Sequence, residues 1–307
     1  MSEHVEEGTE VLTGVELARN LSGLRRRTGA SPAAPARRSL VGLLATVWLL
    51  LAFYPVFYIL FSSFHHRQGF LLGNVWLSPL HPTVGNYEAV LKAGFIHYFI
   101  NSAFVSVLSV VLIVSISLAA SYVLVKVTTR LSRLIFNILL IALAIPLQSL
   151  IIPIYTMIYH LGLYNTYVGL ILPSIAFGLP LTILILVNFL RDIPNELFEA
   201  MQLDGVEEYG MLIRLVVPMS VPALVAVAIY QFIGVWNNFI FPLVLTESSA
   251  MRLLPLAVVS FEGQHSIDVP AVMATVVLSA LPLIIAYVAA RRSLLRALAS
   301  GFAGGSK

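Results

Sequence analysis

Long stretches without a charged residue dominate the pattern of hydrophobic and polar positions along the chain. Stretches lacking Asp, Glu, Lys and Arg cover residues 40–66, 93–125, 134–190, 215–246 and 269–290. A helix of about 20 apolar residues crosses a hydrocarbon layer about 30 Å thick. The third stretch is too long for one crossing, and the polar segment His160–Asn165 divides it. The pattern therefore predicts six transmembrane helices, near 40–64, 99–126, 134–159, 168–190, 219–245 and 271–290.

The composition agrees with a chain that lies largely in a membrane. Hydrophobic residues make up 59% and charged residues 11%, whereas soluble domains have about 25% charged and 45–50% apolar residues. None of the apolar stretches alternates as the strands of a membrane barrel do. We expect an all-α polytopic membrane protein, which excludes an ordinary soluble enzyme. The chain has no cysteine, which excludes disulfides, thiolate metal sites and catalytic thiols.

The positions of Lys and Arg predict the orientation. Of the 18 basic residues, 15 lie before the first predicted span, between spans two and three, between four and five, or after the sixth. Because Lys and Arg accumulate on the cytoplasmic side, both termini are expected there. Residues 1–39 are expected to form a mobile cytoplasmic tail, 40–290 the transmembrane domain, and 291–307 a cytoplasmic C-terminal tail. The net charge of +3 is too small to indicate nucleic acid.

The predicted spans lack the groups that several transport mechanisms require. No carboxylate and no Arg lies deep within them, and Lys126 is at a span end. Since ionisable groups inside membranes mark proton relays, ion sites and voltage sensors, a proton-driven transporter, a voltage-gated channel and an intramembrane metalloprotease are disfavoured. No catalytic or metal site is expected. None of the three lysines belongs to a Gly-Lys-Ser/Thr sequence, so no P-loop ATPase is predicted in this chain.

The predicted cytoplasmic loop 191–218 has its own helical pattern. A start signal at Asp192–Pro194 precedes a short helix, Asn195–Leu203, on which Leu197, Ala200 and Met201 form an apolar strip. Gly205 predicts a bend, and Asp204 stands three residues before Glu207, the spacing of a capping box. A second helix is expected to reach about Val217, with Pro218 closing the loop. The loop is acidic, so a protein partner with a basic groove suits it better than anionic lipid.

This loop resembles the EAA loop of ATP-binding-cassette (ABC) importer permeases. That pattern has Glu-Ala-Ala, three residues, Gly, nine residues, Ile, one residue and Leu-Pro. The chain has Glu199-Ala200-Met201, then Gly205, Leu215 and Val217-Pro218 at the same spacings. Met201, Leu215 and Val217 depart from the pattern but remain apolar.

Other segments are similar to the carbohydrate-importer branch, in particular the MalG-like subunits of maltose permeases. The similarity covers roughly residues 40–302, although Ala297 and Ala299 replace an expected glycine and threonine in the C-terminal tail. The segments that carry it are Pro82–Tyr87, Leu161–Thr166, Leu172-Pro173, Trp236-Asn237-Asn238-Phe239, Asp268, Met273-Ala274 and Pro282.

The resemblance implies a type I ABC importer permease in the bacterial inner membrane, one of two related permease subunits. It implies partners: two ABC ATPase subunits that bind ATP and Mg, and an extracytoplasmic binding protein that delivers a carbohydrate. The chain itself would be non-catalytic and hold no cofactor. The ATPase-coupling residues would be Glu199, Ala200, Met201, Asp204, Gly205 and Pro218.

Seven polar or aromatic residues of the predicted spans are candidates for contact with the solute. They are Gln148, Tyr155, Tyr159, Tyr230, Trp236, Asn237 and Asn238. Aromatic faces and amides suit a neutral sugar. Interface anchoring of Trp and Tyr, or amide bridges between helices, would equally account for them.

Three alternatives to a carbohydrate importer follow from the same residues. An ABC permease for glycerol-3-phosphate or another polyol derivative would favour basic groups along the pathway, and the spans have none. A secondary transporter would need a coupling-ion site, for which no carboxylate is at hand. A membrane scaffold would not need the EAA-like loop.

Overall fold

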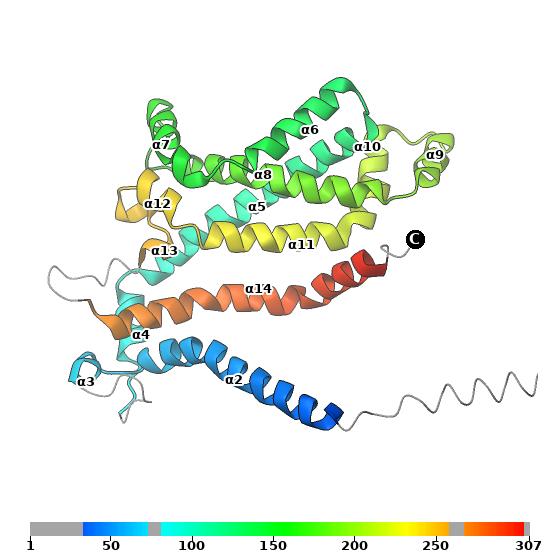
Figure 1. Ribbon diagram of the computed structural model, residues 1–307. Coiled ribbons are helices and arrows are strands. Elements are labelled where there is room, and N and C mark those ends of the chain that lie inside the picture. Colours follow the sequence, from blue (N-terminus) through cyan, green and yellow to red (C-terminus); the bar gives the residue numbers. More distant parts are fainter. Residues whose placement is uncertain (1–32, 73–80, 258–266, 304–307) are drawn as a thin grey trace, which may run out of the picture. The chain divides into compact units, whose positions relative to one another are not determined.

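The computed structural model describes residues 33–72, 81–257 and 267–303, which are helical and contain no strand. Most of the expected N-terminal tail, residues 1–32, lies outside the described residues. The chain divides into two units, residues 1–57 and 58–307. Helix α2 (Ala33–Ser62), which contains Pro55, begins in the first unit and ends in the second (Figure 1).

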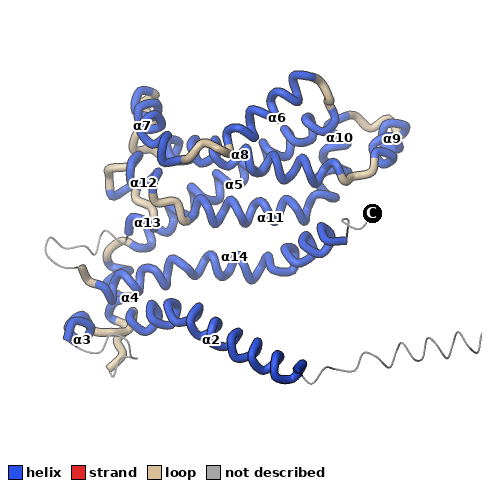
Figure 2. Tube along the Cα trace, viewed as in Figure 1, coloured by secondary structure: helices blue, strands red, loops and turns tan. Residues whose placement is uncertain are grey.

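Residues 58–307 form a bundle of long helices with short helices at both ends (Figures 1 and 2). Its helices after α2 are α3 (Arg67–Leu72), α4 (Gly85–Lys92), α5 (Phe95–Lys126), α6 (Arg130–Ala142), η1 (Leu147–Leu150), α7 (Ile151–His160), α8 (Tyr167–Arg191), α9 (Asn195–Leu203), α10 (Glu208–Met211), η2 (Leu212–Val216), α11 (Val217–Trp236), α12 (Ile240–Leu245), η3 (Ser249–Met251), α13 (Leu254–Ala257) and α14 (Val269–Ala303).

Within the described residues, five helical segments are long and apolar enough to cross a membrane, and a bent pair can provide a sixth. The five are Ser39–Ser62, Phe95–Lys126, Tyr167–Arg191, Glu208–Trp236 and Val269–Val288. The fold class predicted from the sequence, an all-α polytopic membrane protein, is confirmed.

The span expected near 134–159 is not one helix, which corrects the sequence-based boundary. It consists of α6 and the η1–α7 segment, bent by 98° at the intervening break. Pro146 lies at this break with extended backbone angles, φ −69° and ψ 132°. A proline removes a backbone donor and disfavours helical geometry in the preceding residue, so the helix ends before it.

The helix expected over 219–245 is also divided. Helix α11 ends at Trp236, and α12 begins at Ile240. Between them the side-chain oxygen of Asn238 accepts a hydrogen bond from the Phe241 amide, 2.9 Å away. This local bond satisfies an N–H of the first turn of α12, which is the role of an N-terminal cap.

Helix α5 packs along α8 through a face of small residues. Ser106, Ser109, Ser117 and Ser121 are fully buried on α5, and Ser121 Oγ donates to the Ile183 carbonyl at 3.3 Å. Small side chains let two helix backbones approach closely, as in other membrane bundles. Helix α11 lies against α5, α8 and α14, so α5, α8 and α11 form the centre of the bundle.

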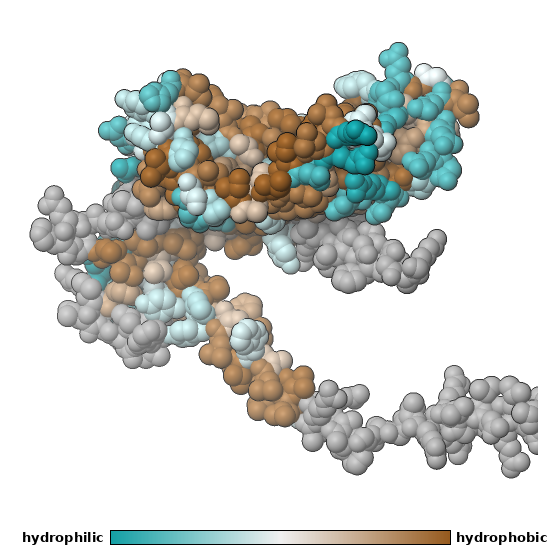
Figure 3. Space-filling view, turned by 45° about the horizontal axis from the view of Figure 1, so that its top comes forward, coloured by the Kyte–Doolittle hydropathy of each residue, from teal (hydrophilic) through white to brown (hydrophobic). Residues whose placement is uncertain are grey.

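The surface of the bundle is apolar along the helices and hydrophilic near their ends (Figure 3). Large exposed apolar side chains occur on the spanning helices, among them Val107 and Val111 of α5 and Ile284 and Ile285 of α14. Soluble monomers rarely expose contiguous apolar surface on this scale. The distribution is that of a protein surrounded by lipid.

Candidate functional site

The loop at one end of the bundle carries the helix predicted from its sequence. Helix α9 covers Asn195–Leu203, and Pro194 immediately precedes it with extended backbone angles, φ −58° and ψ 135°. A proline at this position removes no intrahelical hydrogen bond, because the N–H groups at the start of a helix have no acceptor within it. The helix predicted over 195–203 is confirmed with these bounds.

Gly205 ends α9 in a left-handed conformation, with φ +73°. The Gly205 amide donates to the Gln202 carbonyl and the Val206 amide to the Met201 carbonyl, both at 3.0 Å. These two bonds form a Schellman motif, which satisfies carbonyls left open at the end of a helix. The predicted bend at Gly205 is therefore confirmed.

The predicted capping box between Asp204 and Glu207 is wrong. Asp204 is the C-terminal cap of α9, and the next helix, α10, begins only at Glu208. Glu207 occupies the N-terminal cap of α10 without a side-chain hydrogen bond to it. The Schellman motif places Asp204 in the preceding helix, so its carboxylate is not available to cap the following one.

Pro218 does not close the loop, contrary to the prediction. The helical segment runs continuously from Glu208 to Trp236, and Pro218 lies in the first turn of α11. Ahead of it, residues Leu212–Val216 form a π-helix, in which the Val217 amide bonds to the Leu212 carbonyl. The wider turn accommodates a residue that lacks an N–H and whose ring clashes with the preceding turn of an α-helix.

A polar cluster joins this loop to the end of α5. Lys126 Nζ lies 2.7 Å from Glu208 Oε1, and the Tyr122 hydroxyl donates to Glu208 Oε2 at 2.6 Å. Lys126 also stands over the rings of Tyr122 and Phe198, 5.7 and 5.9 Å from their centres. The sequence does not reveal this pair, because 82 residues separate Lys126 from Glu208. We call Tyr122, Lys126, Phe198 and Glu208 the α5 clasp.

The outer face of α9 combines acidic and apolar side chains. Glu196, Glu199, Ala200 and Asp204 are exposed, and Leu203 is 89% exposed. In the described part of the chain no cation forms an ion pair with Glu199. Of the predicted strip, Leu197 and Ala200 are exposed and Met201 is half-buried, and Leu203 adds to this apolar surface.

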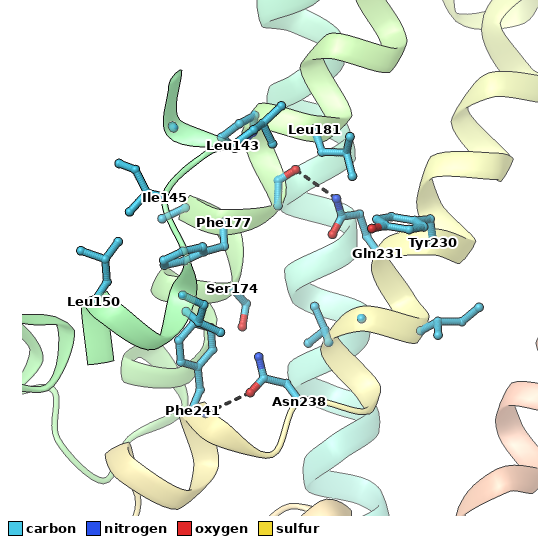
Figure 4. A pocket seen from close by; sticks show the side chains of 18 residues that line it. Leu143, Ile145, Leu150, Ser174, Phe177, Leu181, Tyr230, Gln231, Asn238 and Phe241 are labelled. Atoms are coloured by element: carbon cyan, nitrogen blue, oxygen red, sulfur yellow. Dashed lines mark hydrogen bonds between the residues drawn. The ribbon is translucent and has the colours of Figure 1, made fainter. Parts of the chain in front are cut away.

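A cavity of about 750 Å³ lies among α6, η1, α8, α11 and α12 (Figure 4). Its wall is largely apolar and includes the rings of Phe177, Tyr230 and Phe241. Polar groups come from Ser174, Gln231 and Asn238. Small-molecule sites have volumes of roughly 300–1,000 Å³, with apolar walls and few polar groups. The space therefore has the size and character of a ligand site.

The seven predicted solute-contact residues lie in different places. Tyr230 and Asn238 line the large cavity. Trp236 and Asn237 line a second cavity of about 230 Å³ beside α13 and α14, and Trp236 Nε1 donates to the Ser279 carbonyl at 3.1 Å. Gln148, Tyr155 and Tyr159 line neither of these two cavities. Tyr155 and Tyr159 stack on each other with ring centres 6.0 Å apart.

Gln231 lines the large cavity and is not among the seven candidates from the sequence. It is buried, and its Nε2 donates to the Gly178 carbonyl at 3.0 Å and to Thr182 Oγ1 at 2.8 Å. The sequence does place an amide within an uncharged span, and a polar group in such a span needs hydrogen-bond partners. The sequence cannot show which face of α11 it occupies relative to α8.

Two asparagines fix the segment 245–254 at the other end of the bundle. Asn101 Nδ2 donates to the carbonyls of Ala250 and Arg252 at 2.8 and 3.0 Å, and its oxygen accepts from the Tyr167 hydroxyl at 2.7 Å. Asn165 accepts from the amides of Glu247 and Ser248, each at 3.1 Å. The loops at this end are therefore held by one buried and one half-buried asparagine.

Comparison with known proteins decides the family. Residues 111–299 match the family described as the binding-protein-dependent transport system inner membrane component. A putative ABC transporter permease protein, ORF2, from Caldicellulosiruptor is 38% identical over 83% of this chain and 93% of its own length. The chain belongs to this family of inner-membrane permeases.

Relatives of this permease include proteins named for sugar uptake. The diacetylchitobiose uptake system permease protein NgcG of Streptomyces coelicolor is 30% identical over 84% of this chain and 86% of its own. A solved bacterial ABC transporter involved in import of the acidic polysaccharide alginate has the same fold. Its matching chain gives a TM-score of 0.77 at 22% identity, with 86% of this permease and 98% of that chain covered.

Proposed function

We propose that this permease is one of two membrane subunits of an ATP-driven carbohydrate importer and that the loop 191–218 couples it to the ATPases. The observation that carries the proposal is the outer face of α9. Glu199 stands there without a cationic partner in the described residues, beside the exposed Leu203. Such a face suits a cytosolic partner with a groove and basic residues.

The connections of α9 indicate how its movement would reach the spans. Phe198 of α9 packs near Tyr122, with ring centres 6.5 Å apart, and the α5 clasp adds the Lys126–Glu208 ion pair. On the other side, the loop continues without a break into α11. A displacement of α9 by the ATPases would therefore act on both α5 and α11. ATP and Mg would bind to those separate subunits.

A neutral solute is favoured over an anionic one. None of the 18 residues that line the large cavity is charged, and moving an ion away from water without a counter-charge is costly. The name of the NgcG relative, a diacetylchitobiose uptake permease, also favours a sugar. Glycerol-3-phosphate and other charged polyol derivatives are therefore the weaker alternative.

The proposal extends to the assembly and its orientation. We place both termini and the loop 191–218 in the cytoplasm, on the basis of the 15 basic residues on that side. A second related permease, two ABC ATPases and an extracytoplasmic binding protein would complete the importer. The exposed apolar surfaces of the spans leave room for contact with the second permease.

The test is purification of the tagged permease from its native membranes in mild detergent, followed by an ATPase assay. We expect a second permease and an ABC ATPase to co-purify and hydrolysis to rise with the binding protein and its sugar. Glu199→Ala should abolish that stimulation. Glu196→Ala, which removes an exposed carboxylate from the same helix, should retain it. A permease that purifies alone and moves solute without ATP would refute the proposal in favour of a secondary transporter.

A further inference from the structure

We infer that the cavity of about 750 Å³ is a binding subsite for a neutral, hydroxyl-bearing solute, with Gln231 as a specificity-determining residue. The inference rests on the proposed function, because it names the kind of ligand that this subunit itself contacts during import. Gln231, Phe177, Tyr230 and Ser174 are the groups that carry it.

The amide of Gln231 is held in one orientation. Its side-chain nitrogen makes two hydrogen bonds, to the Gly178 carbonyl and to Thr182 Oγ1, and Thr182 Oγ1 itself donates to Gly178 at 2.8 Å. Both acceptors therefore lie on the same side of the amide, next to its nitrogen. The oxygen Oε1 is thereby fixed on the other side of the amide.

That oxygen is free to accept a hydrogen bond from a ligand. No hydrogen bond within the described residues uses Gln231 Oε1, although the side chain is only 7% exposed. In Figure 4 the oxygen lies on the side of the amide that faces Phe177 and Ser174 across the cavity. A hydroxyl of a solute in the cavity can donate a hydrogen bond to this acceptor.

The remaining wall fits a sugar better than lipid or an ion. Rings of Phe177, Tyr230 and Phe241 offer apolar surface to the C–H faces of a sugar, while its hydroxyls need acceptors and donors. An acyl chain would fill the space but leave Oε1 unpaired. An anionic solute would find no charged side chain among the lining residues. The combination favours a neutral carbohydrate.

The natural absence of cysteine gives a direct test of this cavity. Gly234 lines the cavity, and a Cβ added there meets no atom within 4 Å, so Gly234→Cys introduces a thiol without a clash. In the purified importer in lipid nanodiscs, we expect a charged, water-soluble thiosulfonate reagent to modify it. Ile285→Cys, on the exposed apolar face of α14, is the control and should react far more slowly because lipid excludes the reagent.

Protection by sugar then distinguishes a binding subsite from a water-filled space. Maltose, cellobiose and diacetylchitobiose are tested as neutral probes, with glycerol-3-phosphate as the anionic one. We expect whichever sugar is transported to slow the modification of Gly234→Cys several-fold, and glycerol-3-phosphate to have no effect. An unreactive thiol would show that lipid or another subunit fills the cavity. A reactive thiol that no transported sugar protects would also overturn the inference.

A pair of variants separates recognition from structural support. Gln231→Met keeps the side-chain length but removes the whole amide, both Oε1 and the anchored Nε2, and we expect KM for the transported sugar to rise about 3- to 10-fold, the worth of the hydrogen bond to the solute. Thr182→Val removes one anchor of the amide but leaves Oε1, so KM should rise less. Equal changes would mean that Gln231 only supports the helices. If no sugar is imported at all, both the proposed function and the inference fail. If sugar is imported normally and the KM of Gln231→Met equals that of the wild type, only the inference is overturned.

Discussion

At the scale of single residues, Gly205 determines how the loop turns away from α9. Its φ of +73° is a conformation that costs other L-residues about 1–2 kcal/mol, and no atom lies near its missing Cβ. Backbone strain is therefore the whole expected effect of Gly205→Ala. This strain favours opening of the Schellman motif, so hydrogen exchange of the Val206 amide, which closes that motif, should accelerate by about 5- to 30-fold.

Gly205→Asn provides the matched comparison for this prediction. Asparagine tolerates the left-handed region better than alanine does, so the Val206 amide should exchange at a rate between those of the wild type and Gly205→Ala. Exchange in the alanine variant at the wild-type rate would mean that the motif does not hold the turn in solution.

Gly178 is required for a different reason, which is close contact between helices. A Cβ at this position would lie 2.6 Å from Ile113 Cδ1 and 3.2 Å from Gln231 Oε1. Overpacking of this kind costs about 1–3 kcal/mol, so Gly178→Ala should lower the unfolding temperature of the purified permease. Ile113→Val removes the clashing methyl. The double variant with Gly178→Ala and Ile113→Val should therefore recover part of the lost unfolding temperature. Additive losses in the double variant would contradict the steric explanation.

At the scale of elements, the α5 clasp sets how firmly the loop is attached. The side chains of Lys126 and Glu208 are 26% and 61% exposed, so solvent screens the ion pair. We expect a double-mutant cycle with Lys126→Met and Glu208→Gln to give a coupling energy of about 0.5–1 kcal/mol that falls with added salt. Thermal unfolding in detergent at low and high salt measures it, and zero coupling at low salt would show that the pair does not anchor the loop.

At the opposite end, Asn101 connects α5, α8 and the segment after α12. Its side chain is 2% exposed and makes hydrogen bonds with Ala250, Arg252 and Tyr167. Asn101→Ala leaves two carbonyls and a hydroxyl without this partner, and should destabilise the fold by on the order of 2 kcal/mol or more. Tyr167→Phe removes one of these bonds and should cost about 1 kcal/mol. Thermal unfolding compares the two, and equal losses would refute the ranking.

At the scale of the whole molecule, local signals were predictable from the sequence, and pairings between distant residues were not. The bounds of α9 and the turn at Gly205 follow from proline, glycine and apolar spacing within a dozen residues. Uncharged composition predicts a single span near 134–159, whereas the division into two helices at Pro146 depends on how far a proline bends the chain. Contacts such as Gln231 with Gly178 depend on the rotation of two helices about their axes, which a single sequence does not specify.

The contacts at the two ends of the bundle favour counting the bent pair as one span. Lys126, just before α6, pairs with Glu208 at the end of the bundle that carries α9. Asn165, just after α7, contacts residues 245–248 at the opposite end. The segment α6–η1–α7 therefore leads from one end of the bundle to the other. We expect it to act as one bent crossing, which would bring the number of spans from five to the six that the sequence predicts.

This path through the bundle makes the orientation testable in cells with single cysteines on the cysteine-free chain. Leu161, Gln202 and Glu247 are all exposed, so cysteine there should disturb little. An impermeant thiol reagent added to spheroplasts should label Leu161→Cys and Glu247→Cys, because both lie at the end opposite the loop 191–218. Gln202→Cys should react only after the membrane is opened, since α9 must face the cytosol to meet an ATPase. Labelling of Gln202→Cys from outside would show the opposite orientation and would contradict coupling through α9. Protection of Leu161→Cys alone would mean that the bent pair re-enters the membrane.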